Sequence, residues 1–90
     1  MIPIKGLTYG VIEAALIQLG FRVYVDDRMR VYRHPDGALI AFPPVHLQDD
    51  VLRHHLFSAS ITVADFGLMD RHDFEFLLLK LGMPSGKVAA

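Results

Sequence analysis

The chain contains no cysteine and no apolar run long enough to cross a bilayer. Without cysteine there is no disulfide framework and no thiolate chemistry. A membrane-spanning helix needs about 20 consecutive apolar residues, and no segment approaches that length. The first ten residues, MIPIKGLTYG, also lack the pattern of a signal peptide. We therefore expect a cytoplasmic protein without membrane contact.

An excess of charge of one sign is also missing, because the formal net charge is −1 with neutral histidines. A domain that binds nucleic acid through its phosphates is normally strongly basic. The charge balance argues against a general nucleic-acid binder and leaves room only for a local basic patch. A hydrophobic content of 52% together with so little net charge favours self-association.

The 90 residues predict one domain with a single core. We place this domain at residues 1–83 and expect a flexible tail at 84–90. The chain has neither a glycine-rich phosphate loop nor a nucleophile elbow, so we expect no cofactor and no conventional enzyme.

The first half of the chain predicts a helix followed by three strands. Thr8 suits the N-cap of a helix over about 9–19, and Gly20 suits the position after its end. From Phe21 to Phe42 the pattern changes to a period of two, with turns expected at 26–27 and 34–37. This arrangement predicts an antiparallel meander packed on helices through its apolar face.

The second half predicts a polar connection over 45–53 and two helices. The first of these helices begins near His54 or His55, ends before Gly67, and turns Leu56, Ala59, Ser60 and Val63 inward. The last helix begins after the N-cap Asp70 and ends at Gly82. The expected fold class is α+β: a helix, a three-stranded antiparallel meander and two helices.

Several local features resemble the HicA toxins, which are mRNA interferases with a double-stranded-RNA-binding-domain-like fold. They are a first helix ending in Leu-Gly-Phe (19–21), a strand ending in Tyr-Arg-His-Pro-Asp-Gly (32–37), a third strand closing in proline, and a later helix. The resemblance covers roughly residues 5–66 and implies a toxin–antitoxin module and RNA as substrate. The family's Gly-Ser-His motif matches residues 27–29 here, so Met29 stands where the catalytic histidine is expected. A thioether cannot transfer a proton, and the resemblance therefore implies a catalytically degenerate member, with His34 as the nearest replacement base.

The best candidate for a binding site is the polar face of the predicted meander. In the expected register, this face carries three arginines and two tyrosines: Arg22, Tyr24, Arg28, Arg30 and Tyr32. Arginine contacts phosphates and tyrosine stacks on bases, but both residues are also favoured at protein interfaces. An ordinary solvated face, a protein interface and an RNA site all fit this pattern.

A second candidate surface is the outer side of the last helix. Phe76 and Leu79 lie outside the apolar stripe that faces the core. Exposed apolar side chains of this kind favour a partner contact, with either a second copy or another protein. The alternative is a helix buried on both sides within one protomer.

The five histidines do not predict a metal site. His54 and His55 are adjacent and cannot face the same way on a helix, and no pair has i, i+4 spacing. A zinc site would require the fold to bring His34, His46 and a carboxylate together. We expect no metal, and we predict a small HicA-like protein that binds a protein or RNA partner without catalysis. The alternative is an active mRNA interferase with a displaced catalytic histidine.

Overall fold

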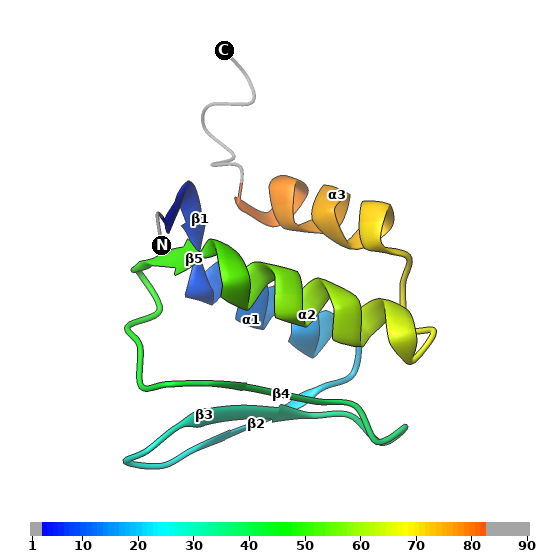
Figure 1. Ribbon diagram of the computed structural model, residues 1–90, viewed down its shortest axis with the longest axis horizontal. Coiled ribbons are helices and arrows are strands. Elements are labelled where there is room, and N and C mark those ends of the chain that lie inside the picture. Colours follow the sequence, from blue (N-terminus) through cyan, green and yellow to red (C-terminus); the bar gives the residue numbers. More distant parts are fainter. Residues whose placement is uncertain (1–2, 83–90) are drawn as a thin grey trace.

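The protein has an α+β fold in which all three helices lie on one side of a three-stranded sheet (Figure 1). The computed structural model describes residues 3–82, so the expected tail at 84–90 lies outside the described residues. The elements follow one another as β1 (Pro3–Thr8), α1 (Tyr9–Gln18), β2 (Arg22–Val25), β3 (Arg30–Arg33), β4 (Leu39–Phe42), β5 (Asp50–Leu52), α2 (Arg53–Asp65) and α3 (Arg71–Gly82). The predicted fold class is confirmed.

The elements form three layers. The sheet β2–β3–β4 lies at one side, α1 and α2 form the middle, and α3 lies on the far side of them (Figure 1). The core fills the space between the sheet and the helices, and its largest buried side chains include Tyr9, Leu16, Tyr32, Phe42 and Phe74. None of the described helices covers the other face of the sheet (Figure 1).

Helix α1 begins and ends at the residues that the sequence marks. Thr8 is the N-cap, and its hydroxyl accepts a hydrogen bond from the N–H of Val11 at 3.3 Å. Gly20 follows the helix with φ of +103°, a conformation that other residues adopt only at a cost. The chain then turns directly into β2.

The pairing of β1 with β5 was not predicted. These two strands form a separate antiparallel sheet, in a region where we expected only a polar connection. The side chain of Asp50 takes part, because its carboxylate accepts a hydrogen bond from the N–H of Gly6 at 3.3 Å. Asp50 is therefore part of a strand, and the expectation of a connection without a strand there was wrong.

The turn of the β2–β3 hairpin lies one residue later than expected. The Asp26 carboxylate accepts hydrogen bonds from the N–H groups of Arg28 and Met29, at 2.7 and 2.9 Å. This side-chain cap moves the turn from 26–27 to 27–28 and pairs Val25 with Arg30. Residues paired across a hairpin share one face, so Arg30 and Tyr32 lie on the inner face of the sheet with Val23 and Val25.

Helices α2 and α3 follow the predicted pattern. In α2 the buried residues are Ala59, Ser60 and Val63, as expected. In α3 the buried residues are Phe74 and Leu78, and the Asp70 carboxylate accepts a hydrogen bond from the N–H of His72 at 3.0 Å, as an N-cap should. The guanidinium of Arg71 lies 5.2 Å from the ring centre of Phe57, which adds a cation–π contact between the two helices.

The contact between Gly20 and His34 at the junction of α1 and β2 can be tested by comparison with Gly67, another glycine with positive φ. A Cβ at Gly20 would lie 3.1 Å from Nε2 of His34, whereas a Cβ at Gly67 would contact nothing within 4 Å. We expect Gly67→Ala to lower the free energy of unfolding by about 1–2 kcal/mol, through backbone strain alone. Gly20→Ala adds the displacement of His34 and should cost about 2–3 kcal/mol. Urea unfolding measures both variants, and equal losses would contradict the role assigned to His34 at this junction.

Candidate functional site

The uncovered face of the sheet carries six side chains in two rows across the strands. Arg22, Arg33 and Leu39 are paired in one row, and Tyr24, Val31 and Ala41 in the other. We call these six residues the outer sheet face. Tyr24 is 49% exposed and Leu39 is 53% exposed, so the face offers an aromatic ring and an aliphatic side chain to a partner. Beside them lies an open hollow of about 470 Å³, which Arg22, Arg33 and His34 help to line.

The charge on the outer sheet face is positive and is not balanced. Arg22 and Arg33 are directly opposite each other on neighbouring strands, and like charges in this position repel. Neither arginine forms an ion pair with any residue of the range 3–82. None of the six side chains is acidic. This arrangement gives the face a site for an anionic group, such as a carboxylate or a phosphate.

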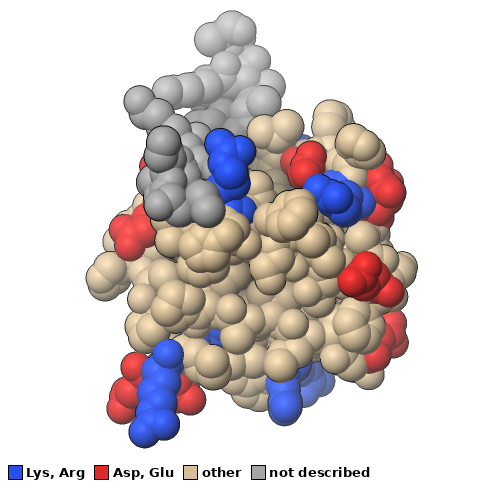
Figure 2. Space-filling view, viewed as in Figure 1, with Lys and Arg blue, Asp and Glu red and all other residues tan. Residues whose placement is uncertain are grey.

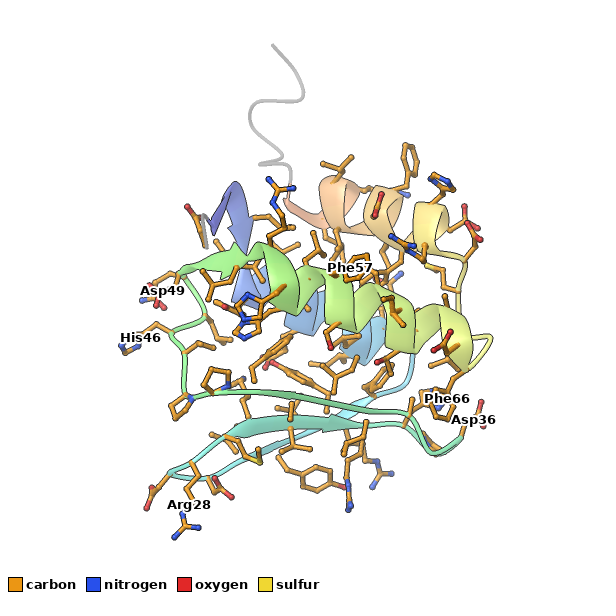
Figure 3. All side chains as sticks on the ribbon, in the orientation of Figure 1. Arg28, Asp36, His46, Asp49, Phe57 and Phe66 are labelled. Carbon is orange, nitrogen blue, oxygen red and sulfur yellow. The ribbon has the colours of Figure 1, made fainter. Side chains whose placement is uncertain are left out.

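Only part of the predicted arginine and tyrosine face is formed. Arg22 and Tyr24 lie on the outer sheet face, as expected. Arg30 and Tyr32 lie on the inner face, because Tyr32 and not Val31 fills the core there. Arg28 lies in the hairpin turn and points away from the body of the protein (Figure 3). The prediction that these five residues share one face was therefore wrong.

Sequence reasoning missed Arg33, which joins Arg22 on the outer sheet face. In the expected register Arg33 belongs to the inner side of its strand. The available signal was the two-residue turn itself, because residues paired across such a hairpin share one face. With Arg22 and Tyr24 outside, a two-residue turn at either 26–27 or 27–28 puts Arg33 outside as well.

The two inward residues of β3 form a hydrogen-bonded cluster with Glu13 of α1. Oε1 of Glu13 accepts hydrogen bonds from Nε of Arg30 at 2.7 Å and from the Tyr32 hydroxyl at 3.0 Å, and Nη2 of Arg30 lies 2.7 Å away. Burial and the bond to Glu13 raise the pKa of Tyr32, so its hydroxyl stays protonated and donates. The hydrogen bond to Glu13 likewise raises the pKa of Arg30. The cluster binds the sheet to α1.

His34 is held by hydrogen bonds on both sides of its ring. Nε2 lies 3.0 Å from the carbonyl oxygen of Leu19, and Nδ1 accepts a hydrogen bond from the N–H of Asp36 at 3.0 Å. The carbonyl is only an acceptor, so Nε2 carries the proton. The ring also packs edge-on against Phe21, with 5.1 Å between the ring centres. In this state neither nitrogen is free to accept or deliver a proton in a reaction.

A second histidine, His55, lies in a half-buried contact that the sequence did not reveal. The Tyr9 hydroxyl lies 2.6 Å from Nδ1 of His55 and accepts a hydrogen bond from the N–H of Leu52 at 3.3 Å. Burial, and then the nearby His54, lower the pKa of His55. Nδ1 of the neutral ring therefore accepts a hydrogen bond from the Tyr9 hydroxyl, and this contact ties α1 to the start of α2.

The histidines and carboxylates do not converge on a metal site. Across the part of the chain that the structure describes, no group of three or more such side chains is arranged to hold a metal ion. His46 and Asp49 point away from the protein at one end of the sheet, and Asp36 lies at the other end, beside Phe66 (Figure 3). The zinc site that we considered, from His34, His46 and a carboxylate, is not formed.

The outer side of α3 is exposed, as the sequence predicts. Phe76 is 72% exposed and Leu79 is 66% exposed, and no other large hydrophobic side chain of residues 6–82 is as exposed. Around α2, in contrast, charged side chains lie mainly toward the edges of the visible surface, and its middle is mostly uncharged (Figure 2). Among the described helices, none is long and apolar enough to cross a membrane.

Comparisons with protein-family models, with curated proteins and with solved structures give no significant match. The resemblance to the HicA toxins therefore stays a prediction from the sequence.

The inward position of Tyr32 is tested by a pair of matched substitutions. Tyr32→Phe removes a hydroxyl that bonds Glu13 and Arg30, and we expect the free energy of unfolding to fall by about 1 kcal/mol. Tyr24→Phe makes the same chemical change on the outer sheet face and should change it by less than about 0.5 kcal/mol. Chemical denaturation measures both values. A larger effect at Tyr24 than at Tyr32 would contradict the register.

The buried contact of His55 predicts a dependence of stability on pH. Because the folded protein lowers the pKa of His55 below the ordinary value of 6.5, protonation favours the unfolded chain. This contribution is complete above about pH 6.5 and is lost as the pH falls below it. We expect the melting temperature to fall between about pH 7.5 and pH 5 by less in His55→Gln than in the wild type. His46→Gln, which removes an exposed histidine, should keep the wild-type slope, and equal slopes in all three proteins would refute the prediction.

Proposed function

We propose that this protein is a non-catalytic binding protein and that the outer sheet face is its binding surface. The observation that carries the proposal is the pair Arg22 and Arg33, which face each other on an uncovered sheet without a carboxylate to balance them. A partner that brings an anionic group to this pair relieves the repulsion. Tyr24 and Leu39 supply the apolar contact around it.

The proposal keeps the HicA-like character expected from the sequence, in a form that has lost its chemistry. Met29 stands where the family's catalytic histidine is expected and lies beside the hairpin turn, with its N–H bonded to Asp26. His34, the nearest replacement, has both ring nitrogens in hydrogen bonds to the backbone. The outer sheet face itself holds no group that titrates near neutral pH. We place the protein in the cytoplasm, where such a partner would be met.

A protein is the partner class that fits the outer sheet face best. Leu39, Val31 and Ala41 form an aliphatic surface next to the two arginines, which suits a partner with apolar side chains and a carboxylate. The low net charge of the chain supports the same choice. RNA is the second candidate, because Tyr24 lies beside the arginines and a half-exposed tyrosine ring can stack on a base.

Two charge reversals test the binding surface. Arg33→Glu changes the charge on the outer sheet face, and Arg28→Glu makes the same change at the hairpin turn. A partner captured from a lysate of the native host is purified, and its binding to each variant is measured by calorimetry. We expect Arg33→Glu to weaken binding at least about tenfold and Arg28→Glu to leave it nearly unchanged. Equal losses in the two variants would mean that total charge, and not this face, governs binding.

The RNA candidate is measured in parallel with a labelled single-stranded RNA. Binding that depends on Arg33, and that weakens as salt rises, would favour RNA over protein. Cleavage of that RNA by the purified wild-type protein, lost in His34→Ala, would overturn the non-catalytic part of the proposal and restore the mRNA interferase alternative.

A further inference from the structure

The outer side of α3 carries a short pattern of charged and apolar side chains that is complementary to itself. Phe76 and Leu79 lie next to each other at i, i+3 spacing and are strongly exposed. Asp73 precedes Phe76 by three residues and Lys80 follows it by four, so both lie on the same outward stripe of the helix. On the inner side, Phe74 and Leu78 are buried in the core.

The two charges of this stripe are free within the described structure. Neither Asp73 nor Lys80 has an ion-pair partner among residues 3–82. Both are exposed, and they lie at nearly equal distances on either side of the middle of α3. An apolar pair that lies between an acidic and a basic side chain matches an inverted copy of the same pattern.

We infer that α3 pairs with α3 of a second copy of this chain, in antiparallel orientation about a two-fold axis. This inference rests on the binding function proposed above and names a second copy as one partner. The two-fold axis passes through the contact at the middle of both helices. Each edge of the stripe then faces the same edge of the stripe on the other copy. Asp73 of each chain then meets Lys80 of the other, and Phe76 packs against Phe76. The two-fold axis therefore forms two Asp73–Lys80 ion pairs, which together pair all four charges.

The position of α3 in the fold agrees with this arrangement. In Figure 1, α3 and the sheet lie on opposite sides of the middle layer of helices, so the pairing covers no part of the outer sheet face. The net charge of −1 adds little repulsion between two copies. The contact is small, so we expect a dissociation constant on the order of micromolar or tens of micromolar.

The first test is the mass of the protein in solution from low to high micromolar concentration. Sedimentation equilibrium should show a reversible rise toward twice the 10.1 kDa of one chain. Phe76→Asp should weaken this association at least about tenfold, with an unchanged circular dichroism spectrum because Phe76 is exposed.

The second test uses two charge variants, each of which should dimerise weakly alone and tightly when mixed with the other. Asp73→Lys places two lysines of each chain against two of the other, and Lys80→Asp does the same with aspartates. Each variant should dimerise less tightly than the wild type, while an equimolar mixture forms a heterodimer in which every pair is again opposite in charge. Asp27→Lys and Arg28→Asp make the same charge changes at the hairpin turn and should leave the mass of the protein unchanged.

The outcomes separate this inference from the proposed function. A wild-type protein that stays monomeric throughout, or a dimer that is insensitive to Phe76→Asp, overturns the α3 contact. Failure of the two charge variants to associate when mixed overturns its antiparallel arrangement. None of these results affects the dependence of partner binding on Arg33, which is measured with Phe76→Asp as well as with the wild type.

Discussion

The carboxylate of Asp26 fixes the register of the β2–β3 hairpin, and the cross-strand pairs of the whole sheet depend on that register. Its hydrogen bonds to the N–H groups of Arg28 and Met29 set a turn at 27–28. Pairing of Val25 with Arg30 follows, and β4 then takes its place against β3. A turn one residue earlier would pair Val25 with Arg28 and would separate Arg22 from Arg33, although both would keep the same face.

The charged side chains on the two faces of β3 are stabilised in different ways. On the inner face, Arg30 and Tyr32 are tolerated because one oxygen of Glu13 accepts hydrogen bonds from both of them. On the outer sheet face, Arg22 and Arg33 have no such partner among residues 3–82 and rely on solvent. The inner cluster therefore stabilises the fold, and the outer pair is the part of the sheet that is available to an anionic partner.

Local signals in the sequence predict most of the fold, and contacts between distant residues account for what they miss. Thr8, Gly20 and Asp70 mark helix ends through interactions within a few residues, and the structure has all three as expected. The pairing of β1 with β5 joins segments more than forty residues apart, so no local pattern announces it. The error in the candidate site has a different origin, because the apolar alternation of β3 predicts that Val31 points inward, whereas the hairpin pairs Val31 with Tyr24 on the outer sheet face.

The outer sheet face carries groups that can contact an anion, and none of its six side chains is a histidine or a carboxylate. Its six side chains include arginine, tyrosine and aliphatic groups, none of which exchanges a proton readily near neutral pH. The adjacent His34 is the one residue of the hollow with a suitable ring, and its two hydrogen bonds join the end of α1 to the β3–β4 turn. Using this ring as a base would require Nδ1 to give up the N–H of Asp36, a contact that holds the β3–β4 turn. If α3 pairs as inferred, the two outer sheet faces of one dimer point in opposite directions, so each face can bind the anionic group of a separate partner.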